Sequence, residues 1–126
     1  MARVEITNGA RQYLDGLNAL DIDQVVSAFA PDAIIRYPGM GTTNPEGFRS
    51  YLEQVKSVLA AFHIDDREVF STENGVAARW TFEATTNNGR TVSCDGIDSW
   101  VFDADGRIHC LDVYYDPSPL LEALQP

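Results

Sequence analysis

Basic side chains are scarce in this sequence. Nine Lys and Arg residues stand against nineteen Asp and Glu residues, which gives a formal net charge of −10 at pH 7. An average field of that sign repels polyanions, so the composition argues against a nucleic acid as a partner. Hydrophobic residues make up 44% of the chain and aromatic residues 10%, a share too high for a disordered protein. We therefore expect a globular chain without nucleic-acid partners.

Long apolar runs are also missing. No segment approaches the roughly 20 consecutive apolar residues that a membrane-spanning helix needs, and residues 1–12 lack the apolar stretch of a secretory signal. We expect a cytoplasmic protein with no membrane partner. With 126 residues, the chain has the usual size of one domain, so residues 1–126 are predicted to form a single domain.

The residue types that build metal and cofactor sites are few. Cys94 and Cys110 show neither CxxC nor metal-ligand spacing, and both lie in strand-like segments, where buried thiols are expected. The two His residues have no clustered acids or thiols around them, which predicts no metal site. The sequence contains neither a Gly-rich phosphate loop nor a G-x-S-x-G elbow. We therefore expect no cofactor.

Helical periodicity predicts three helices in the first half of the chain. The first runs from Ile6 to Leu20, and its apolar stripe is Ile6, Ala10, Tyr13, Leu14, Leu17 and Leu20. The second begins at Asp21, where Gln24 completes a capping box, and residues 31–32 end it. Its inward residues are Val25, Val26 and Phe29. The third is capped by Asn44, and its stripe is Phe48, Tyr51, Leu52, Val55, Leu59 and Phe62.

The rest of the chain has the two-residue period of strands. Residues 33–37 are predicted as a first strand, followed by the turn-rich segment PGMGTTNP. Asn-Gly or Asp-Gly pairs at 74–75, 88–89 and 105–106 then separate four β-rich runs, which cover residues 64–72, 76–86, 90–102 and 107–115. The leucines of the C-terminal tail, Leu120, Leu121 and Leu124, are expected to dock as a final helical turn.

This order of elements predicts an α+β fold. Each helix carries one apolar stripe, so the N-terminal helices must pack on one face of the antiparallel β-sheet. Strands of this length twist and curl. A curved antiparallel sheet with the helices on its concave face forms a cone with an apolar cavity, and such cavities bind small molecules.

Two polar side chains are predicted to enter that cavity. Asp98 is the single acid on an apolar strand face that also carries Trp100, and Tyr13 lies in the middle of the first helical stripe. A structural Asp98 bonded to a backbone amide or to Arg79, and a core Tyr13 bonded to a carbonyl, are the alternatives. Two neutral acids in one apolar pocket would be able to donate hydrogen bonds to a developing oxyanion.

Three segments show a likeness to known proteins: YLDGLNALDIDQVVSAFAPDAIIRYPG, GFRSYLEQV and CDGIDSWVFDADGRIHCLDVYYD. Together they resemble the ketosteroid isomerase and SnoaL-like polyketide cyclase group of the nuclear transport factor 2-like superfamily. The resemblance covers nearly the whole chain. Its FAPDA, GID and FDADGRI motifs are typical of the fold and specify no one reaction.

The resemblance assigns roles to three residues. Tyr13 and Asp98 match the tyrosine and the protonated aspartic acid of the isomerase oxyanion hole. Tyr37 stands where the isomerases have their proton-shuttling aspartate, and a phenol is a poor general base at neutral pH. Tyr37 is therefore expected to orient or protonate the substrate, and steroid isomerisation by the family mechanism is not expected. Phe29 and Leu52 occupy the places of supporting tyrosines.

The remaining expectations concern binding. The predicted lining of the pocket is Phe29, Trp80, Trp100 and Tyr115, with His63 at the rim. A surface role at the helix C-terminus is the alternative for His63. Asp112 is expected on the outer face of the sheet, and Ile97 and Val101 on that face give mild support to the homodimer that the resemblance implies.

Three functions fit these residues. The leading one is a small-molecule enzyme that acts on a hydrophobic, steroid- or polyketide-like carbonyl compound by proton transfer, enolate stabilisation or cyclisation. The alternative is a non-catalytic module of the same fold that binds a hydrophobic ligand or a protein. A hydratase or epoxide hydrolase ranks last, because no acid that would activate water can be placed.

Overall fold

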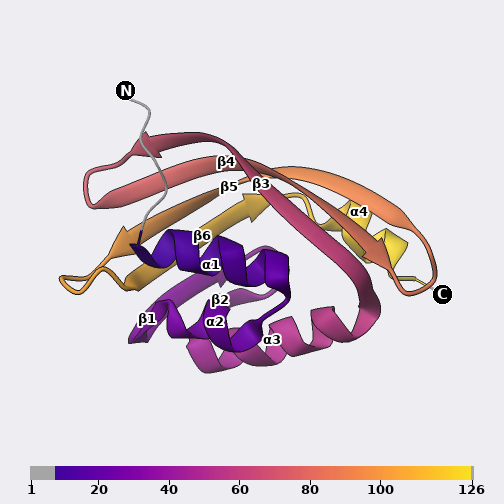
Figure 1. Cartoon of the computed structure of the whole chain (residues 1–126), viewed down its shortest axis with the longest axis horizontal. Coiled ribbons are helices and arrows are strands. Elements are labelled where there is room, and N and C mark those ends of the chain that lie inside the picture. Colours follow the sequence, from indigo (N-terminus) through magenta and orange to yellow (C-terminus); the bar gives the residue numbers. More distant parts are fainter. Residues whose placement is uncertain (1–7, 126) are drawn as a thin grey trace.

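Six strands form one mixed sheet, and helices cover one of its faces (Figure 1). The computed structural model describes residues 8–125, so Ile6 of the first predicted helix lies outside the described residues. The helices are α1 (Asn8–Ala19), α2 (Ile22–Ser27), α3 (Pro45–Val58) and α4 (Ser118–Ala123). The strands are β1 (Phe29–Tyr37), β2 (Gly41–Thr43), β3 (Leu59–Ser71), β4 (Gly75–Thr86), β5 (Thr91–Phe102) and β6 (Ile108–Tyr115). The predicted α+β class is confirmed.

The sheet has the strand order β2-β1-β6-β5-β4-β3. Strands β3 to β6 form the antiparallel meander that the sequence predicts. Strand β1 joins β6 in parallel, which makes the sheet mixed. Gly89 and Gly106 lie in two of the turns with φ of +88° and +80°, a backbone conformation that glycine adopts without the steric penalty of a side chain.

Curvature brings the sheet around the helices. Strands β3, β4 and β5 have 13, 12 and 12 residues, and strands of this length twist strongly. Register shifts at residues 59–61 and 66–68 bend β3 further. Figure 1 shows these strands arching over α1, α2 and α3. The concave side of the arch is therefore the interior, and its convex side faces away from the helices.

Strand β1 begins four residues earlier than the sequence predicts. Phe29 is its first residue, and Pro31 lies within the strand, so the predicted second helix ends at Ser27 and residues 31–32 do not end it. The pairing of β1 with β6 shifts register between Phe29 and Ile34. Proline is tolerated at such a bulge because its missing N–H removes no ladder hydrogen bond there. The turn-rich segment after β1 also contains the short strand β2.

Helix α3 begins as predicted and ends early. The side chain of Asn44 accepts a hydrogen bond from the Gly47 N–H at 2.9 Å, and Pro45 is the first helical residue. Val58 is the last helical residue, so Leu59 and Phe62 of the predicted stripe belong to β3. The register shift at residues 59–61 lets both face the interior, where they line the cavity.

The short elements at either end of the helical layer complete the enclosure. Asp21 caps α2 as predicted, but the Gln24 side chain donates to the Gln12 carbonyl at 3.3 Å instead of closing a capping box. A Cβ on Gly16 would lie 2.7 Å from Val25 Cγ2, so glycine allows α1 and α2 to pack closely.

The predicted C-terminal turn forms as α4, and Leu120 is buried. None of the helices between residues 8 and 125 has the length and apolar character needed to cross a membrane.

Candidate active site

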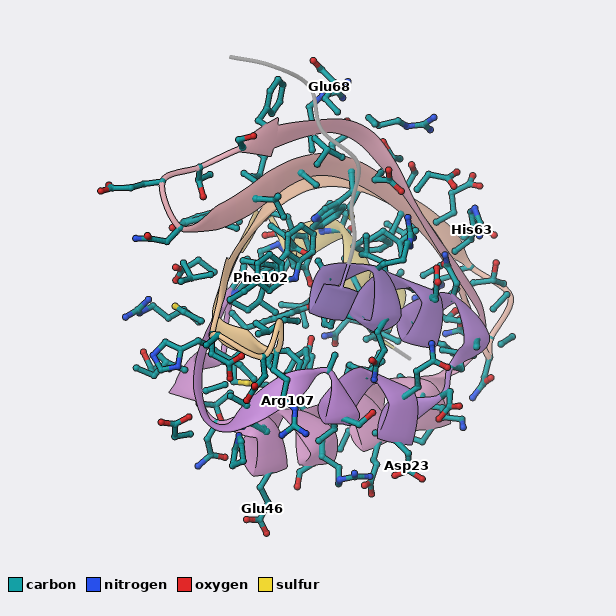
Figure 2. All side chains as sticks on the ribbon, turned by 60° about the vertical axis from the view of Figure 1, so that its left-hand side comes forward. Asp23, Glu46, His63, Glu68, Phe102 and Arg107 are labelled. Atoms are coloured by element: carbon teal, nitrogen blue, oxygen red, sulfur yellow. The ribbon has the colours of Figure 1, made fainter. Side chains whose placement is uncertain are left out.

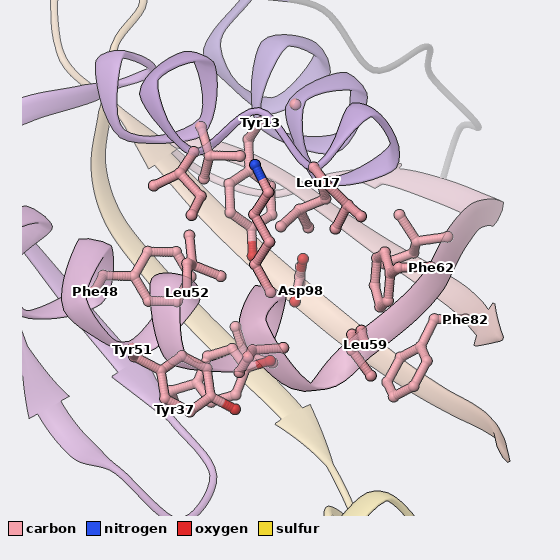
Figure 3. Close-up of a pocket in the computed structure, with 18 of the residues that line it drawn as sticks. Tyr13, Leu17, Tyr37, Phe48, Tyr51, Leu52, Leu59, Phe62, Phe82 and Asp98 are labelled. Atoms are coloured by element: carbon pink, nitrogen blue, oxygen red, sulfur yellow. The ribbon is translucent and has the colours of Figure 1, made fainter. Parts of the chain in front are cut away.

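An apolar cavity lies between the concave face of the sheet and the helices (Figure 3). Its volume is about 70 Å³, counted as the space that the centres of water-sized molecules can reach. This is room for roughly five to seven waters, and thus for a compound of one or two rings. Most of its wall is aliphatic or aromatic. The polar or charged side chains in the wall are Tyr13, Asp21, Tyr37, Tyr51, Lys56, Trp80, Asp98 and Tyr115.

Tyr13 enters the cavity from α1. The residue is 2% exposed, and its ring packs against Phe29 at 5.8 Å, Trp100 at 6.1 Å and Phe48 at 6.3 Å between centroids. Burial raises the pKa of the Tyr13 hydroxyl well above 10, and the nearby Asp98 raises it further. The hydroxyl is therefore a neutral group that can donate a hydrogen bond at any physiological pH.

Asp98 enters from the middle of β5, where Ala78 and Val113 are its cross-strand neighbours. It is 2% exposed, and its Oδ1 atom has no hydrogen-bond partner among the described residues. Burial raises the pKa of this carboxyl to about 7, against a smaller lowering by the Trp80 indole. The Trp80 N–H lies close enough for this effect but does not meet the geometry of a hydrogen bond. Near neutral pH, about half of the Asp98 carboxyl is thus in the neutral acid form.

Tyr13 and Asp98 meet inside the cavity as the sequence predicts. Figure 3 shows the hydroxyl end of Tyr13 and the carboxyl of Asp98 directed toward one another, and their electrostatic interaction is part of the pKa shift of Tyr13. The structural alternative of an Asp98–Arg79 pair does not form, because Arg79 pairs with Glu68 at 3.0 Å. Two proton donors therefore point into one apolar cavity, where a ligand oxygen can accept from both.

A second polar group is formed by three tyrosines. Tyr37 ends β1 just before Pro38, Tyr51 lies on α3, and Tyr115 ends β6. The Tyr37 ring lies 5.1 Å from that of Tyr51 and 5.9 Å from that of Tyr115. Burial raises the pKa of all three hydroxyls, and that of Tyr37 to well above 10. Tyr37 is therefore an even poorer base than a phenol in water, as expected from its position.

The structure places five of the eight predicted site residues in the cavity wall: Tyr13, Tyr37, Trp80, Asp98 and Tyr115. Phe29 and Trp100 lie behind it in the core, 4% and 0% exposed, where both support the Tyr13 ring. His63 lies on the side of β3 that faces away from the cavity, where it pairs with Asp65 at 2.9 Å (Figure 2). Since the helix ends at Val58, strand parity turns Phe62 and Ile64 inward and His63 outward.

Several wall residues were not predicted as site residues. Tyr51 and Phe48 belong to the apolar stripe of α3, and that stripe was the signal that could have identified them. Lys56 and Asp21 are exposed residues that line the cavity at its mouth. Their spacing gives no sequence signal, because Lys56 lies beside the stripe and Asp21 is marked only as a helix cap.

Gly96 makes room for one wall of the site. It pairs with Trp80 across β4 and β5, and a Cβ at this position would lie 2.5 Å from the Trp80 ring and 2.7 Å from the Tyr114 carbonyl oxygen. The absence of a side chain lets the indole lie flat over β5, two residues before Asp98. In the part of the chain that the structure describes, no three His, Cys, Asp or Glu side chains are grouped to hold a metal ion.

Comparisons with known proteins agree with this architecture. The model of the SnoaL-like domain family matches residues 10–110. No curated protein sequence matches the chain. Among solved structures, the protein TerC co-crystallised with polyporic acid has a TM-score of 0.80 and 24% identity, with 94% of this chain and 96% of TerC covered.

Two further structures are similar over nearly their whole length. An NTF2-like protein of unknown function from Burkholderia pseudomallei has a TM-score of 0.81 and 19% identity, covering 96% of this chain and 100% of that one. A Catenulispora acidiphila protein with a ketosteroid isomerase-like fold, in complex with trimethylamine, has a TM-score of 0.82 and 11% identity, with coverage of 94% and 93%. At these identities the likeness shows the fold alone.

Proposed function

The chain belongs to the SnoaL-like domain family, and on this basis we propose that it is an enzyme acting on a small hydrophobic carbonyl compound without a cofactor. The observation that carries the proposal is the Asp98 acid, buried without a partner for Oδ1 beside the Tyr13 hydroxyl in an apolar cavity. A buried carboxyl without a partner is costly for folding, and a role toward a ligand accounts for its presence.

The proposed chemistry is stabilisation of an enolate. The carbonyl oxygen of the substrate accepts hydrogen bonds from the Tyr13 hydroxyl and from the neutral Asp98 acid. When the neighbouring C–H bond breaks and a water molecule takes up the proton as the base, the electron pair moves to this oxygen as negative charge. Donors fixed in an apolar site stabilise that charge more than water does. The wall around them, including Phe48, Trp80 and Leu120, excludes water from the reacting oxygen.

Asp98 variants test the enzyme proposal. Asp98→Ala and Asp98→Leu each remove one oxyanion donor and should lower turnover about 10²- to 10³-fold, with the fold retained by circular dichroism. Asp95→Asn is the matched control, because Asp95 lies on the same strand but on its outer face, where it accepts from Thr81 at 2.6 Å. Full turnover in both Asp98 variants would contradict the proposal.

A non-catalytic binding module is the second candidate. It is favoured by Tyr37, which replaces the proton-shuttling carboxylate of ketosteroid isomerases and whose raised pKa prevents it from acting as a base. Soaking a panel of cyclic enones, steroids and polyketide-like ketones separates the two candidates. Product formation supports the enzyme, whereas thermal stabilisation without product across the whole panel supports the module.

We further propose a homodimer formed through the outer face of the sheet. Ile97 and Tyr114 are cross-strand neighbours on this face and are 45% and 60% exposed, and burying such a patch favours association. Light scattering coupled to gel filtration should give twice the mass of the chain, and a monomer at micromolar concentration would contradict this. A cytoplasmic location remains a prediction from the sequence.

A further inference from the structure

The tyrosine cluster of Tyr37, Tyr51 and Tyr115 is a polar group that the proposed chemistry does not use. Its members come from β1, α3 and β6, and all three line the cavity. Each hydroxyl affects the pKa of the others, which shows that the three lie near one another. Among the described residues, none of these hydroxyls is bonded to a carboxylate or to a backbone carbonyl. The three hydroxyls are thus grouped together at the cavity.

Hydroxyls that no carboxylate or carbonyl holds can be directed to a ligand. A phenol carries one proton to donate and can also accept a hydrogen bond. Any of the three hydroxyl protons can turn to a ligand oxygen, and a hydroxyl on the ligand can donate to one of the tyrosine oxygens in return. The three phenols are neutral and bring no cation to the cavity. An anion would lose its hydration there without a counter-charge, so an uncharged oxygen is a better match.

An aromatic ring separates this cluster from Tyr13 and Asp98. Phe48 lies between Tyr13 and Tyr51, with 6.3 Å to each ring centroid and interplanar angles of 22° and 13°. Figure 3 shows Tyr13 and Asp98 next to one another, with Tyr37 and Tyr51 on another side of the cavity. The cavity therefore has a polar group at either end of a flat apolar wall, and one or two fused rings span such a wall.

We infer that the substrate is a compact ring compound with two oxygen functions, a carbonyl that Tyr13 and Asp98 bind and a second uncharged oxygen that the tyrosine cluster binds at the far end. This inference rests on the proposed function, since it places the reacting carbonyl at Asp98. The inference restricts the possible substrates to hydrophobic carbonyl compounds of one or two rings. These compounds carry a hydroxyl or a second carbonyl at a position remote from the reacting carbonyl. The cavity volume agrees with that size.

A matched ligand series tests the inference. The parent is 1-tetralone, a bicyclic ketone, and its 5-, 6- and 7-hydroxy derivatives place a second oxygen at successive positions on the far ring. Dissociation constants are measured by calorimetry for the wild-type protein. At least one regioisomer should bind about tenfold more tightly than the parent, which is the gain of one hydrogen bond to a buried neutral group.

Phenylalanine variants assign that gain to the cluster. In Tyr37→Phe, Tyr51→Phe or Tyr115→Phe, the ratio of the parent and hydroxylated dissociation constants should fall toward one. Tyr114→Phe is the control, because Tyr114 adjoins Tyr115 in β6 but is 60% exposed on the outer face, and the ratio should stay near ten.

The outcomes separate this inference from the proposed function. If no regioisomer binds more tightly than the parent, or if the gain survives in all three cluster variants, the inference is overturned. If Asp98→Leu weakens the binding of the parent in that case, the proposed carbonyl site is still supported. If neither the parent nor any derivative binds, both are overturned.

Discussion

Asp98 shows how the environment of one residue sets its chemistry. Its neighbours across β4 and β6 are the apolar Ala78 and Val113, and burial moves the pKa of its carboxyl from 3.8 to about 7. At that value a large share of the carboxyl keeps its proton at neutral pH and can donate a hydrogen bond to a carbonyl oxygen. Tyr13 is a donor over a wider pH range, because its pKa lies far above physiological pH.

The raised pKa of Asp98 also makes stability depend on pH. Below about pH 4 the carboxyl is protonated in both the folded and the unfolded chain, so its ionisation does not affect the free energy of unfolding. Between pH 4 and 7 the unfolded chain gains free energy by ionising while the folded protein stays protonated, and stability falls. Above pH 7 both forms are ionised and the loss is constant. The loss of stability follows from the rise of the Asp98 pKa from 3.8 to about 7 and amounts to about 4 kcal/mol.

Asp98→Asn should remove this dependence. Urea unfolding of the wild type and of Asp98→Asn at pH 4, 6 and 8 measures the difference in the free energy of unfolding at each pH. The difference should shift by about 3 to 4 kcal/mol in favour of the variant between pH 4 and pH 8. The Asp95→Asn control should show no comparable shift. A difference that is constant over this range would indicate that Asp98 has an ordinary pKa.

Among the elements, α3 contributes the wall between the two polar groups of the cavity. Phe48, Tyr51, Leu52 and Val55 project from it, and its start is fixed by the Asn44 side chain. The capped N–H belongs to Gly47, next to Phe48, so fraying of the first turn would reach the wall directly.

Loss of the cap should destabilise the protein by a predictable amount. Asn44→Ala removes the acceptor for the Gly47 N–H and should lower the free energy of unfolding by about 1 kcal/mol. Asn44→Asp retains a cap at the same position and should stay near the wild-type value. The urea midpoint of each variant measures the effect. Equal destabilisation by both substitutions would show that the cap bond contributes nothing.

The same elements show what the sequence alone could predict. The helical stripe placed Tyr13 inward and strand parity placed Asp98 inward, because both elements are long enough for their period to fix a face. The helical stripe predicts His63 at the rim because its spacing continues through Phe62, whereas the chain changes from helix to strand at Leu59. Phe29 was placed on a helix because Pro31 reads as a helix stop, although a bulge accommodates it in β1.

At the scale of the whole molecule, the sequence could not predict which inward-facing side chains reach the cavity and which stay in the core behind it. Trp80 and Trp100 both face inward by parity, but only Trp80 reaches the cavity, and Trp100 is enclosed by the core. The distance of each residue from the helical layer decides this, and that distance depends on the curvature of the sheet and on the bulges in β3. The convergence of Tyr37, Tyr51 and Tyr115 from three separate elements likewise needs the folded chain.

The most direct measurement is an NMR titration of the Asp98 carboxyl carbon, with and without a bound ketone such as 1-tetralone. The account predicts a pKa of about 7 in the free protein and a higher value in the complex, because a carbonyl that accepts a hydrogen bond from the acid favours its protonated form. A pKa near the ordinary value of 3.8 in the free protein, or a value that the ketone leaves unchanged, would contradict it.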